Sequence, residues 1–136
     1  MSDAFHKLTL ETHKLKWEDD LPFSLDSNDI FFQDDALDEI EHVFLEPNLI
    51  HNRILEDTNL VIGEIGFGFG LNFLSTCKSW VKNSNNGLLT FFSIDHKVPT
   101  KTEIKRLFKK FEILSDLEDE FFESFDPIHN GINKFF

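Results

Sequence analysis

Hydrophobic and polar residues alternate in the first part of this sequence and then repeat at helical spacing. Residues 6–11 and 14–19 alternate on either side of Thr12-His13, which predicts an antiparallel β-hairpin. Residues 36–45 follow two aspartates and place apolar side chains three and four positions apart, which predicts a capped helix that ends before Pro47. A further helical turn is expected over residues 48–55. Turns are expected at Pro22 and residues 26–28, and the inward side chains of the first helix are expected to be Leu37, Ile40, Phe44 and, as a further candidate, Val43.

A strand, a glycine-rich turn and a helix are expected over residues 59–81. Residues 60–65 are mostly apolar, rich in β-branched side chains and too few for a helix, which predicts a buried strand. Gly66, Gly68 and Gly70 allow positive φ angles and carry no Cβ, so a ligand can lie against the backbone there. Together these elements predict a cradle of the nucleotide-binding type. The helix is expected to pack through an apolar face made of Leu71, Phe73, Leu74, Cys77, Trp80 and Val81.

A second buried strand is expected over residues 88–94, after a loop over residues 83–87, and it ends at Asp95. A strand–helix–strand unit winds right-handed and makes its strands parallel neighbours, so their carboxyl ends lie at the same edge. We therefore expect Glu64 and Asp95 to flank one crevice. An acidic side chain at the position of Asp95 can accept hydrogen bonds from both ribose hydroxyls of an adenosyl group. The alternative is that Asp95 is only a turn residue.

The last third of the sequence predicts two helices and the beginning of a strand. One helix is expected from Pro99 and Thr100 to Ile113, and Ser115 is expected to cap an acidic helix that ends at Phe125. A loop over residues 126–131 and a strand over residues 132–136 follow. The expected fold is α/β, with a hairpin and helical lead-in over residues 1–58. Residues 59–136 are expected to form the first part of a Rossmann-like domain with an incomplete parallel sheet.

The spacing of the glycines narrows the choice of ligand. A phosphate-binding loop ends in Gly-Lys-Ser/Thr, whereas Gly70 is followed by leucine and asparagine. A dinucleotide fingerprint, Gly-x-Gly-x-x-Gly, fits neither from Gly66 nor from Gly68. The acidic Glu64 two places before a Gly-x-Gly-x-Gly turn resembles the first motif of Rossmann-like S-adenosylmethionine methyltransferases, whose cationic ligand suits a carboxylate. The alternative is a turn that only lets its helix pack closely on the strand.

Charge restricts the possible partners of this 136-residue chain. Its 25 acidic and 13 basic residues give a formal charge of −12, which argues against a general nucleic-acid surface. Six basic residues, however, gather between positions 97 and 110, where a helix would align them as a strip for an RNA backbone or as a solvated face. These residues, called the basic strip below, are Lys97, Lys101, Lys105, Arg106, Lys109 and Lys110.

Other candidate chemistry is sparse. The single cysteine, Cys77, is expected to be a buried thiol and indicates a reducing cytoplasm. His42, His51 and His96 are not spaced as metal ligands, and no Ser/His/Asp or Cys/His arrangement stands out. We therefore predict no metal site and assign no catalytic residue. Neither a signal peptide nor a run of apolar residues long enough to span a membrane is expected.

Four segments resemble a known family. Residues 29–32, 36–48, 63–73 and 92–95 are similar, in order, to the methyltransferase domain of the bacterial tRNA 5-methylaminomethyl-2-thiouridine biosynthesis bifunctional proteins. The run Gly-Phe-Gly-Phe-Gly-Leu-Asn-Phe is far more restrictive than a bare glycine turn, and the resemblance extends over residues 29–131. The sequence departs from the family pattern at Phe31, Gln33, Ala36 and Pro47.

The resemblance implies methyl transfer from S-adenosylmethionine to the amine of a 5-aminomethyl-2-thiouridine at the wobble position of tRNA. It implies no flavin site here, because the family binds flavin in a C-terminal domain that this chain lacks. It also implies contacts to tRNA, for which Lys101, Lys105, Arg106 and Lys109 are the candidates. The cofactor-binding residues that it implies are Glu64, Gly66, Phe67, Gly68, Gly70, Asn72 and Asp95.

Two hypotheses remain open from the sequence. In the first, the chain is a truncated cytoplasmic methyltransferase that lacks the family's Leu-Asp-Gly-Phe segment, which carries an aspartate at the substrate amine. In the second, it is a non-catalytic binding module that retains only the cofactor cradle. An NAD-type oxidoreductase is disfavoured by the glycine spacing.

Overall fold

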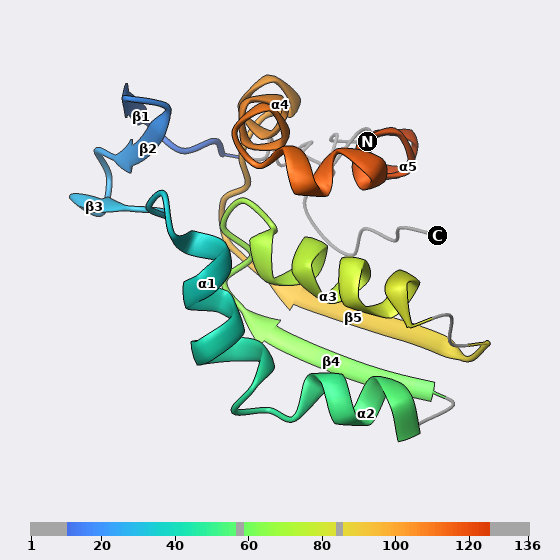
Figure 1. Cartoon of the computed structure of the whole chain (residues 1–136). Coiled ribbons are helices and arrows are strands. Elements are labelled where there is room, and N and C mark those ends of the chain that lie inside the picture. The colour runs from blue at the N-terminus through green and yellow to red at the C-terminus, as the bar shows by residue number, and fades with distance from the viewer. Residues whose placement is uncertain (1–10, 57–58, 84–85, 126–136) are drawn as a thin grey trace, which may run out of the picture.

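The computed structural model describes residues 11–56, 59–83 and 86–125 (Figure 1). Three short antiparallel strands begin this part of the chain, in the order β1 (Leu15–Glu18), β2 (Leu21–Ser24) and β3 (Asp29–Ile30). Helix α4 lies beside these strands, α5 lies on the far side of α4, and a second, parallel sheet lies below them with α2 and α3 (Figure 1). The structure is α/β, as the sequence predicts, and it includes a small antiparallel hairpin.

The hairpin pairs differently from the prediction within the described residues. The expected strand over residues 14–19 is confirmed as β1, but it pairs with β2, which follows it. Asp19 and Asp20 make this turn possible because both adopt positive φ, the conformation of a two-residue hairpin turn. Pro22, expected in a turn, lies inside β2 and accepts a hydrogen bond from the Phe31 N–H through its carbonyl. Most of the other expected strand lies outside the described residues.

Three helical segments connect the two sheets. Helix α1 (Ala36–Ile40) continues as a π-helical turn (Glu41–Leu45), and α2 (Ile50–Glu56) follows. These segments confirm the helix predicted over residues 36–45 and the helical turn after it. Ala36 and Leu45 are buried, whereas Val43 is 67% exposed, so its predicted inward position is wrong.

The central unit has the predicted topology. Strands β4 (Asn59–Ile65) and β5 (Leu88–Ile94) are parallel neighbours with Asn59 opposite Leu88 and Ile65 opposite Ile94, and α3 (Leu71–Lys82) connects them. One sheet face packs in a core with α2 and α3, where Leu60 and Ile62 meet Ile54 and Trp80. The other face is exposed, so the prediction that both strands are buried is right for one face only. The exposed apolar side chains of that face are Val61, Ile65, Leu88, Phe92 and Ile94.

Two helices follow β5, as predicted, but their ends differ. Helix α4 (Lys101–Lys110) begins with a capping box in which Thr100 and Glu103 exchange side-chain and backbone hydrogen bonds. A 3₁₀ turn (Glu112–Leu117) precedes α5 (Glu118–Ser124). Ser115 lies within this 3₁₀ turn, so it does not cap α5, which starts without a side-chain cap. The predicted loop over residues 126–131 and the strand after it lie outside the described residues.

The main core joins both ends of the described chain around α4. Phe32 and Ala36 pack in one cluster with Phe69, Leu74 and α4. The predicted place of Val81 on the packed face of α3 is wrong: it is 60% exposed, because its neighbour Trp80 is the residue of this turn that packs against the core. Within the described residues, none of the helices has the length and apolar character needed to cross a membrane. The core therefore fixes the glycine turn, which carries Phe69, against the N-terminal strands. Its buried members are Phe32, Ala36, Phe69, Leu71, Leu74, Ile104, Leu107, Phe108, Phe111, Leu114, Leu117, Phe121 and Phe125.

Candidate functional site

The glycine turn between β4 and α3 adopts the backbone that its sequence predicts. Gly66, Gly68 and Gly70 have φ angles of 90°, 55° and 77°. A Cβ on Gly70 would lie 2.6 Å from Phe67 Cζ, so the turn can close only with glycine at that position. A Cβ on Gly66 would meet no atom within 4 Å. Gly70 is therefore required by the fold, whereas Gly66 leaves open space beside the backbone.

Glu64 occupies the sheet position just before the turn, on the covered face of β4. Its Oε2 accepts a hydrogen bond of 3.1 Å from Asn72 Nδ2 on α3. Its Oε1 is buried and has no hydrogen-bond partner in the described part of the chain. Burial raises the pKa of the Glu64 carboxyl and outweighs the hydrogen bonds from Asn72 and Ser93, which lower it. A bound cation would relieve this cost of a buried negative charge.

Asp95 follows β5 and holds the glycine turn in place. Its Oδ2 accepts a hydrogen bond of 3.0 Å from the Gly68 N–H, and its Oδ1 accepts from the N–H groups of His96 (2.7 Å) and Lys97 (3.3 Å). Burial raises the pKa of Asp95, but the backbone N–H groups outweigh it, so the pKa lies below its usual value and the group stays ionised. The side chain is 11% exposed. Asp95 is therefore more than a residue that ends its strand.

The two carboxylates meet at one edge of the parallel sheet, as their positions after parallel strands predict. The charge of Asp95 contributes to the raised pKa of Glu64, as expected of neighbouring negative groups. Of the other predicted site residues, Asn72 holds Glu64, and Phe67 packs its ring beneath Gly70. The structure thus brings the predicted residues together around a single glycine turn.

Aromatic residues from the N-terminal strands border this edge. Phe31 Cδ1 lies 3.8 Å from the place of a Cβ on Gly68, and the rings of Phe31 and His13 are 4.7 Å apart in an edge-to-face arrangement. The ring of His96 is 6.2 Å from that of His13. His13 was missed in the sequence because it stands in a predicted turn more than fifty residues before the glycines. Only the tertiary packing brings it to this edge.

A second polar group lies away from the glycine turn. His51 contacts Ser79 Oγ through Nδ1 (2.9 Å) and Glu41 Oε1 through Nε2 (2.6 Å). This Ser/His/Glu chain was not expected, because its members are spread over three helical segments. Ser79 is only 9% exposed and lies inside α3, so we interpret the chain as a structural link between the π-helical turn, α2 and α3. Among the described residues, no group of three or more side chains is arranged to hold a metal ion.

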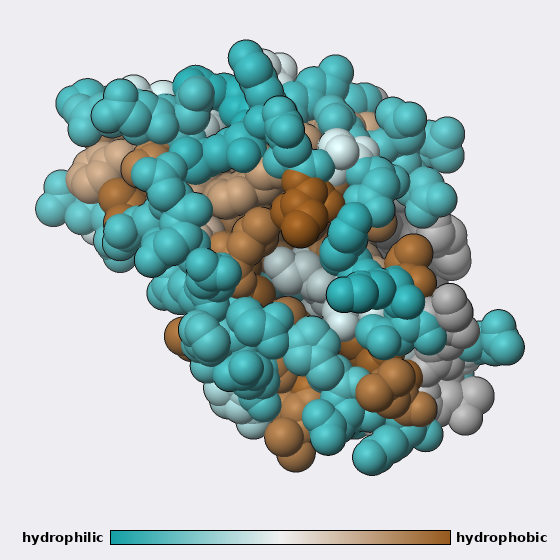
Figure 2. All heavy atoms as spheres, in the orientation of Figure 1, coloured by the Kyte–Doolittle hydropathy of each residue, from teal (hydrophilic) through white to brown (hydrophobic). Residues whose placement is uncertain are grey.

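The N-terminal strands and the segment after them neutralise much of the basic strip. Lys97 Nζ lies 3.1 Å from Asp26 Oδ2, and Arg106 Nη2 lies 2.8 Å from Asp20 Oδ1. The Arg106 guanidinium also stacks over the Trp17 ring at 3.9 Å from its centre. Lys110 pairs with Asp34. The surface over this part of the molecule is mostly hydrophilic (Figure 2).

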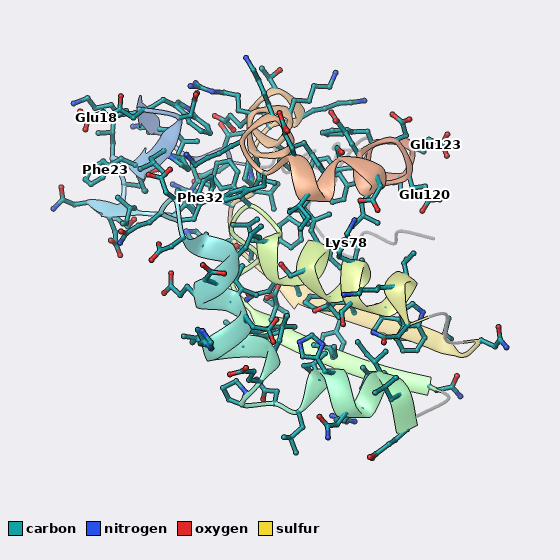
Figure 3. All side chains as sticks on the ribbon, in the orientation of Figure 1. Glu18, Phe23, Phe32, Lys78, Glu120 and Glu123 are labelled. Carbon is teal, nitrogen blue, oxygen red and sulfur yellow. The ribbon has the colours of Figure 1, made fainter. Side chains whose placement is uncertain are left out.

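The remaining lysines of the strip have a different environment. Lys101 and Lys105 place their ammonium groups 5.5 and 5.7 Å from the centre of the Phe122 ring. Lys78, which is not part of the strip, extends from α3 toward α5 (Figure 3), and its Nζ lies 2.6 Å from Asp116 Oδ2. The positive charge available to an outside partner is therefore less than the sequence count indicates.

The fold and this edge define an α/β protein with a strand, glycine turn, helix and strand unit, the arrangement that places ligands at the carboxyl ends of parallel strands. No family model matches the sequence. The chain is 29% identical over 133 residues to the tRNA 5-methylaminomethyl-2-thiouridine biosynthesis bifunctional protein MnmC of Marinobacter nauticus. The matched stretch covers 92% of this chain and 21% of that protein.

Two further relatives carry the same name. The Leptospira borgpetersenii protein is 34% identical over 127 residues, which cover 89% of this chain and 19% of the relative. The Legionella pneumophila protein is 32% identical over 127 residues, which cover 88% of this chain and 19% of the relative. The predicted resemblance is therefore confirmed: the chain is homologous to a part of the MnmC proteins. It spans about a fifth of the length of these curated relatives.

Proposed function

We propose that this chain binds S-adenosylmethionine and serves methyl transfer in the modification of the tRNA wobble uridine. The observation that carries the proposal is the convergence of Glu64 and Asp95 on the glycine turn at the carboxyl edge of two parallel strands. The name of the relatives, which concerns biosynthesis of 5-methylaminomethyl-2-thiouridine in tRNA, supports the reaction and the substrate class.

The residues present fit such a cofactor. The buried, unpartnered Oε1 of Glu64 suits the ammonium group of the methionine part. The open space beside Gly66 lets a ligand approach the backbone. Asp95 suits the ribose hydroxyls, which would share its oxygen atoms with the N–H groups that it already accepts. Phe67, Gly68, Gly70 and Asn72 shape the turn and orient Glu64.

The cofactor supplies an activated methyl group, and the proposed acceptor is the amine of 5-aminomethyl-2-thiouridine. The contribution of this chain is to hold and orient, because in-line displacement depends mainly on the placement of the two reactants. We assign no residue of the chain to the proton of the amine. Binding is therefore the appropriate first test, and a chain that binds without turnover would be a binding module.

The proposed tRNA contacts are made by part of the basic strip. Lys105 and Lys109 are exposed on α4, whereas Arg106 is held by Asp20 and Trp17. Lys105→Ala is therefore expected to weaken tRNA binding and to lower its salt dependence, because each phosphate contact releases a counterion. Filter binding of unmodified tRNA at several salt concentrations measures both quantities, with Lys82→Ala at the distant end of α3 as the control.

Calorimetric titration with S-adenosylhomocysteine tests the proposed function, with NADH as the control ligand. We expect binding of S-adenosylhomocysteine alone, and its loss in Asp95→Ala, because that change removes both the ribose acceptor and the hydrogen bond to Gly68. Asp116→Ala is the matched control, since Asp116 pairs with Lys78 away from the turn. A folded wild-type chain that binds NADH instead, or neither ligand, would contradict the proposal.

A further inference from the structure

Buried polar atoms without a partner gather at the candidate site. In the described part of the chain, three buried side-chain atoms have no hydrogen-bond partner: Glu64 Oε1, Ser93 Oγ and His13 Nε2. Glu64 and Ser93 are opposite each other in the register of β4 and β5, and the Ser93 hydroxyl lowers the pKa of Glu64 as a hydrogen-bond donor, so these two side chains can partner each other. Native proteins rarely leave buried polar atoms unpaired, because each has given up its bonds to water. A polar ligand at this edge would give His13 Nε2 the partner that it lacks among the described residues.

His13 reaches this edge from the start of the described chain. Its ring packs edge-on against Phe31, which borders Gly68, and faces the ring of His96, which follows Asp95. His13 therefore lies beside the corner at which Asp95 accepts the hydrogen bond from Gly68. This is the side of the site that the proposed function gives to the ribose, away from Glu64.

A bridge through Asp26 holds His13 there without using its side chain. Asp26 Oδ2 accepts a hydrogen bond of 3.0 Å from the backbone N–H of Lys14, the residue after His13. The same oxygen accepts a hydrogen bond of 3.1 Å from Lys97 Nζ, two residues after Asp95. The segment is thus tied to the end of β5 by its backbone, and the imidazole Nε2 is left for another partner.

We propose that His13 is a further ligand contact, whose Nε2 forms a hydrogen bond with the adenosyl part of the bound cofactor. An imidazole nitrogen can donate or accept, and the adenosyl group offers hydroxyl groups and ring nitrogens for either role. The inference rests on the proposed function and adds a residue from the segment before β1 to the cradle. It assigns Glu64 and His13 to opposite ends of one ligand.

Two ligands separate these roles in calorimetric titrations. S-adenosylhomocysteine carries both the adenosyl and the amino-acid part, whereas 5′-methylthioadenosine lacks the amino-acid part. His13→Phe keeps a ring against Phe31 but removes the hydrogen bond, so it is expected to weaken both ligands by roughly 3- to 10-fold. Glu64→Gln is expected to weaken S-adenosylhomocysteine alone. His13→Gln, which retains a polar atom near the place of Nε2, is expected to restore most of the affinity.

The controls distinguish this inference from the proposed function. His42→Phe changes an exposed histidine that pairs only with Glu46 in the described structure, and it is expected to leave both affinities unchanged. Thermal unfolding of His13→Phe and His13→Gln is expected to stay close to that of the wild type, because the bridge through Asp26 remains. Equal affinities of wild type and His13→Phe for both ligands would overturn the role of His13 while leaving the proposed function intact. Failure of the folded wild type to bind S-adenosylhomocysteine would overturn both.

Discussion

We expect Gly70 to be needed for folding and Gly66 for ligand binding, and two alanine substitutions test this division. At Gly70, φ is 77° and an added Cβ would lie 2.6 Å from Phe67 Cζ. At Gly66, φ is 90° and an added Cβ meets no atom within 4 Å. Both substitutions strain the backbone, but only Gly70→Ala also displaces a ring in contact with the start of α3.

The expected losses in the free energy of unfolding follow from the backbone strain at both positions and the steric overlap at Gly70. A left-handed conformation costs an L-residue about 1–2 kcal/mol, and forcing extra volume into a packed site costs about 1–3 kcal/mol more. We therefore expect Gly70→Ala to lower the free energy of unfolding by about 2–4 kcal/mol. Gly66→Ala should lower it by about 1–2 kcal/mol. Typical domains have only about 5–15 kcal/mol in total, so the difference is measurable.

Urea unfolding followed by circular dichroism measures the free energies, and titration with S-adenosylhomocysteine measures binding. Gly66→Ala is expected to bind at least 10-fold more weakly although it is the more stable of the two variants, because its methyl group fills the space left for the ligand. Gly63→Ala is the control for binding: its added Cβ would lie 2.5 Å from Cζ of the half-exposed Phe92 ring, so it is also expected to lower stability, but it lies on the sheet face opposite Glu64 and is expected to leave binding unchanged. Equal losses of stability at positions 66 and 70, or unchanged binding by Gly66→Ala, would refute the reasoning.

Three further changes have defined outcomes. The folded-state pKa of Glu64 is raised from 4.5. The free energy of unfolding therefore falls as the pH rises from 4.5 through the raised pKa, because the carboxylate ionises more readily in the unfolded chain. Glu64→Gln should therefore increase the urea midpoint at pH 7 and flatten its pH dependence, while weakening S-adenosylhomocysteine by about 10-fold; a less stable variant would contradict this. Thr100→Ala should lower the free energy of unfolding by about 1 kcal/mol by removing the capping box, whereas the exposed Thr102→Ala should change it by less than about 0.5 kcal/mol. Cys77 is half-buried, and burial raises the pKa of its thiol to about 12, so an aromatic disulfide reagent at pH 8 should label the native chain much more slowly than the denatured chain; equal labelling rates would contradict this.

The local pattern of residues was sufficient to predict the central unit of β4, the glycine turn, α3 and β5. Apolar and β-branched residues before three glycines predicted β4, the turn and α3, and the right-handed rule predicted that β5 is its parallel neighbour. The meeting of Glu64 and Asp95 followed from that topology alone. These predictions succeeded because they depend on contacts between neighbours in the sequence and on the chirality of the chain.

Burial was less predictable, because it depends on what else packs against an element. Val43 and Val81 are exposed because their neighbours Phe44 and Trp80 are the residues of those turns that pack against the core. The parallel sheet has apolar residues on both faces, yet in the described structure α2 and α3 cover only one, which leaves Ile65 92% exposed. Pro22 lies in a strand because its carbonyl finds a partner in Phe31.

The sequence by itself determined the order of the elements, the glycine turn and the two acidic side chains that face it. Only the tertiary structure decided which distant groups come into contact. Asp95 accepts a hydrogen bond from the Gly68 N–H, Arg106 pairs with the carboxylate of Asp20, and His13 lies beside the end of β5, where its ring is near that of His96. The physical reason is the separation along the sequence of the residues that interact. Helical and strand periods arise between residues a few positions apart, whereas a hydrogen bond or ion pair between distant residues depends on how the packed core places their elements.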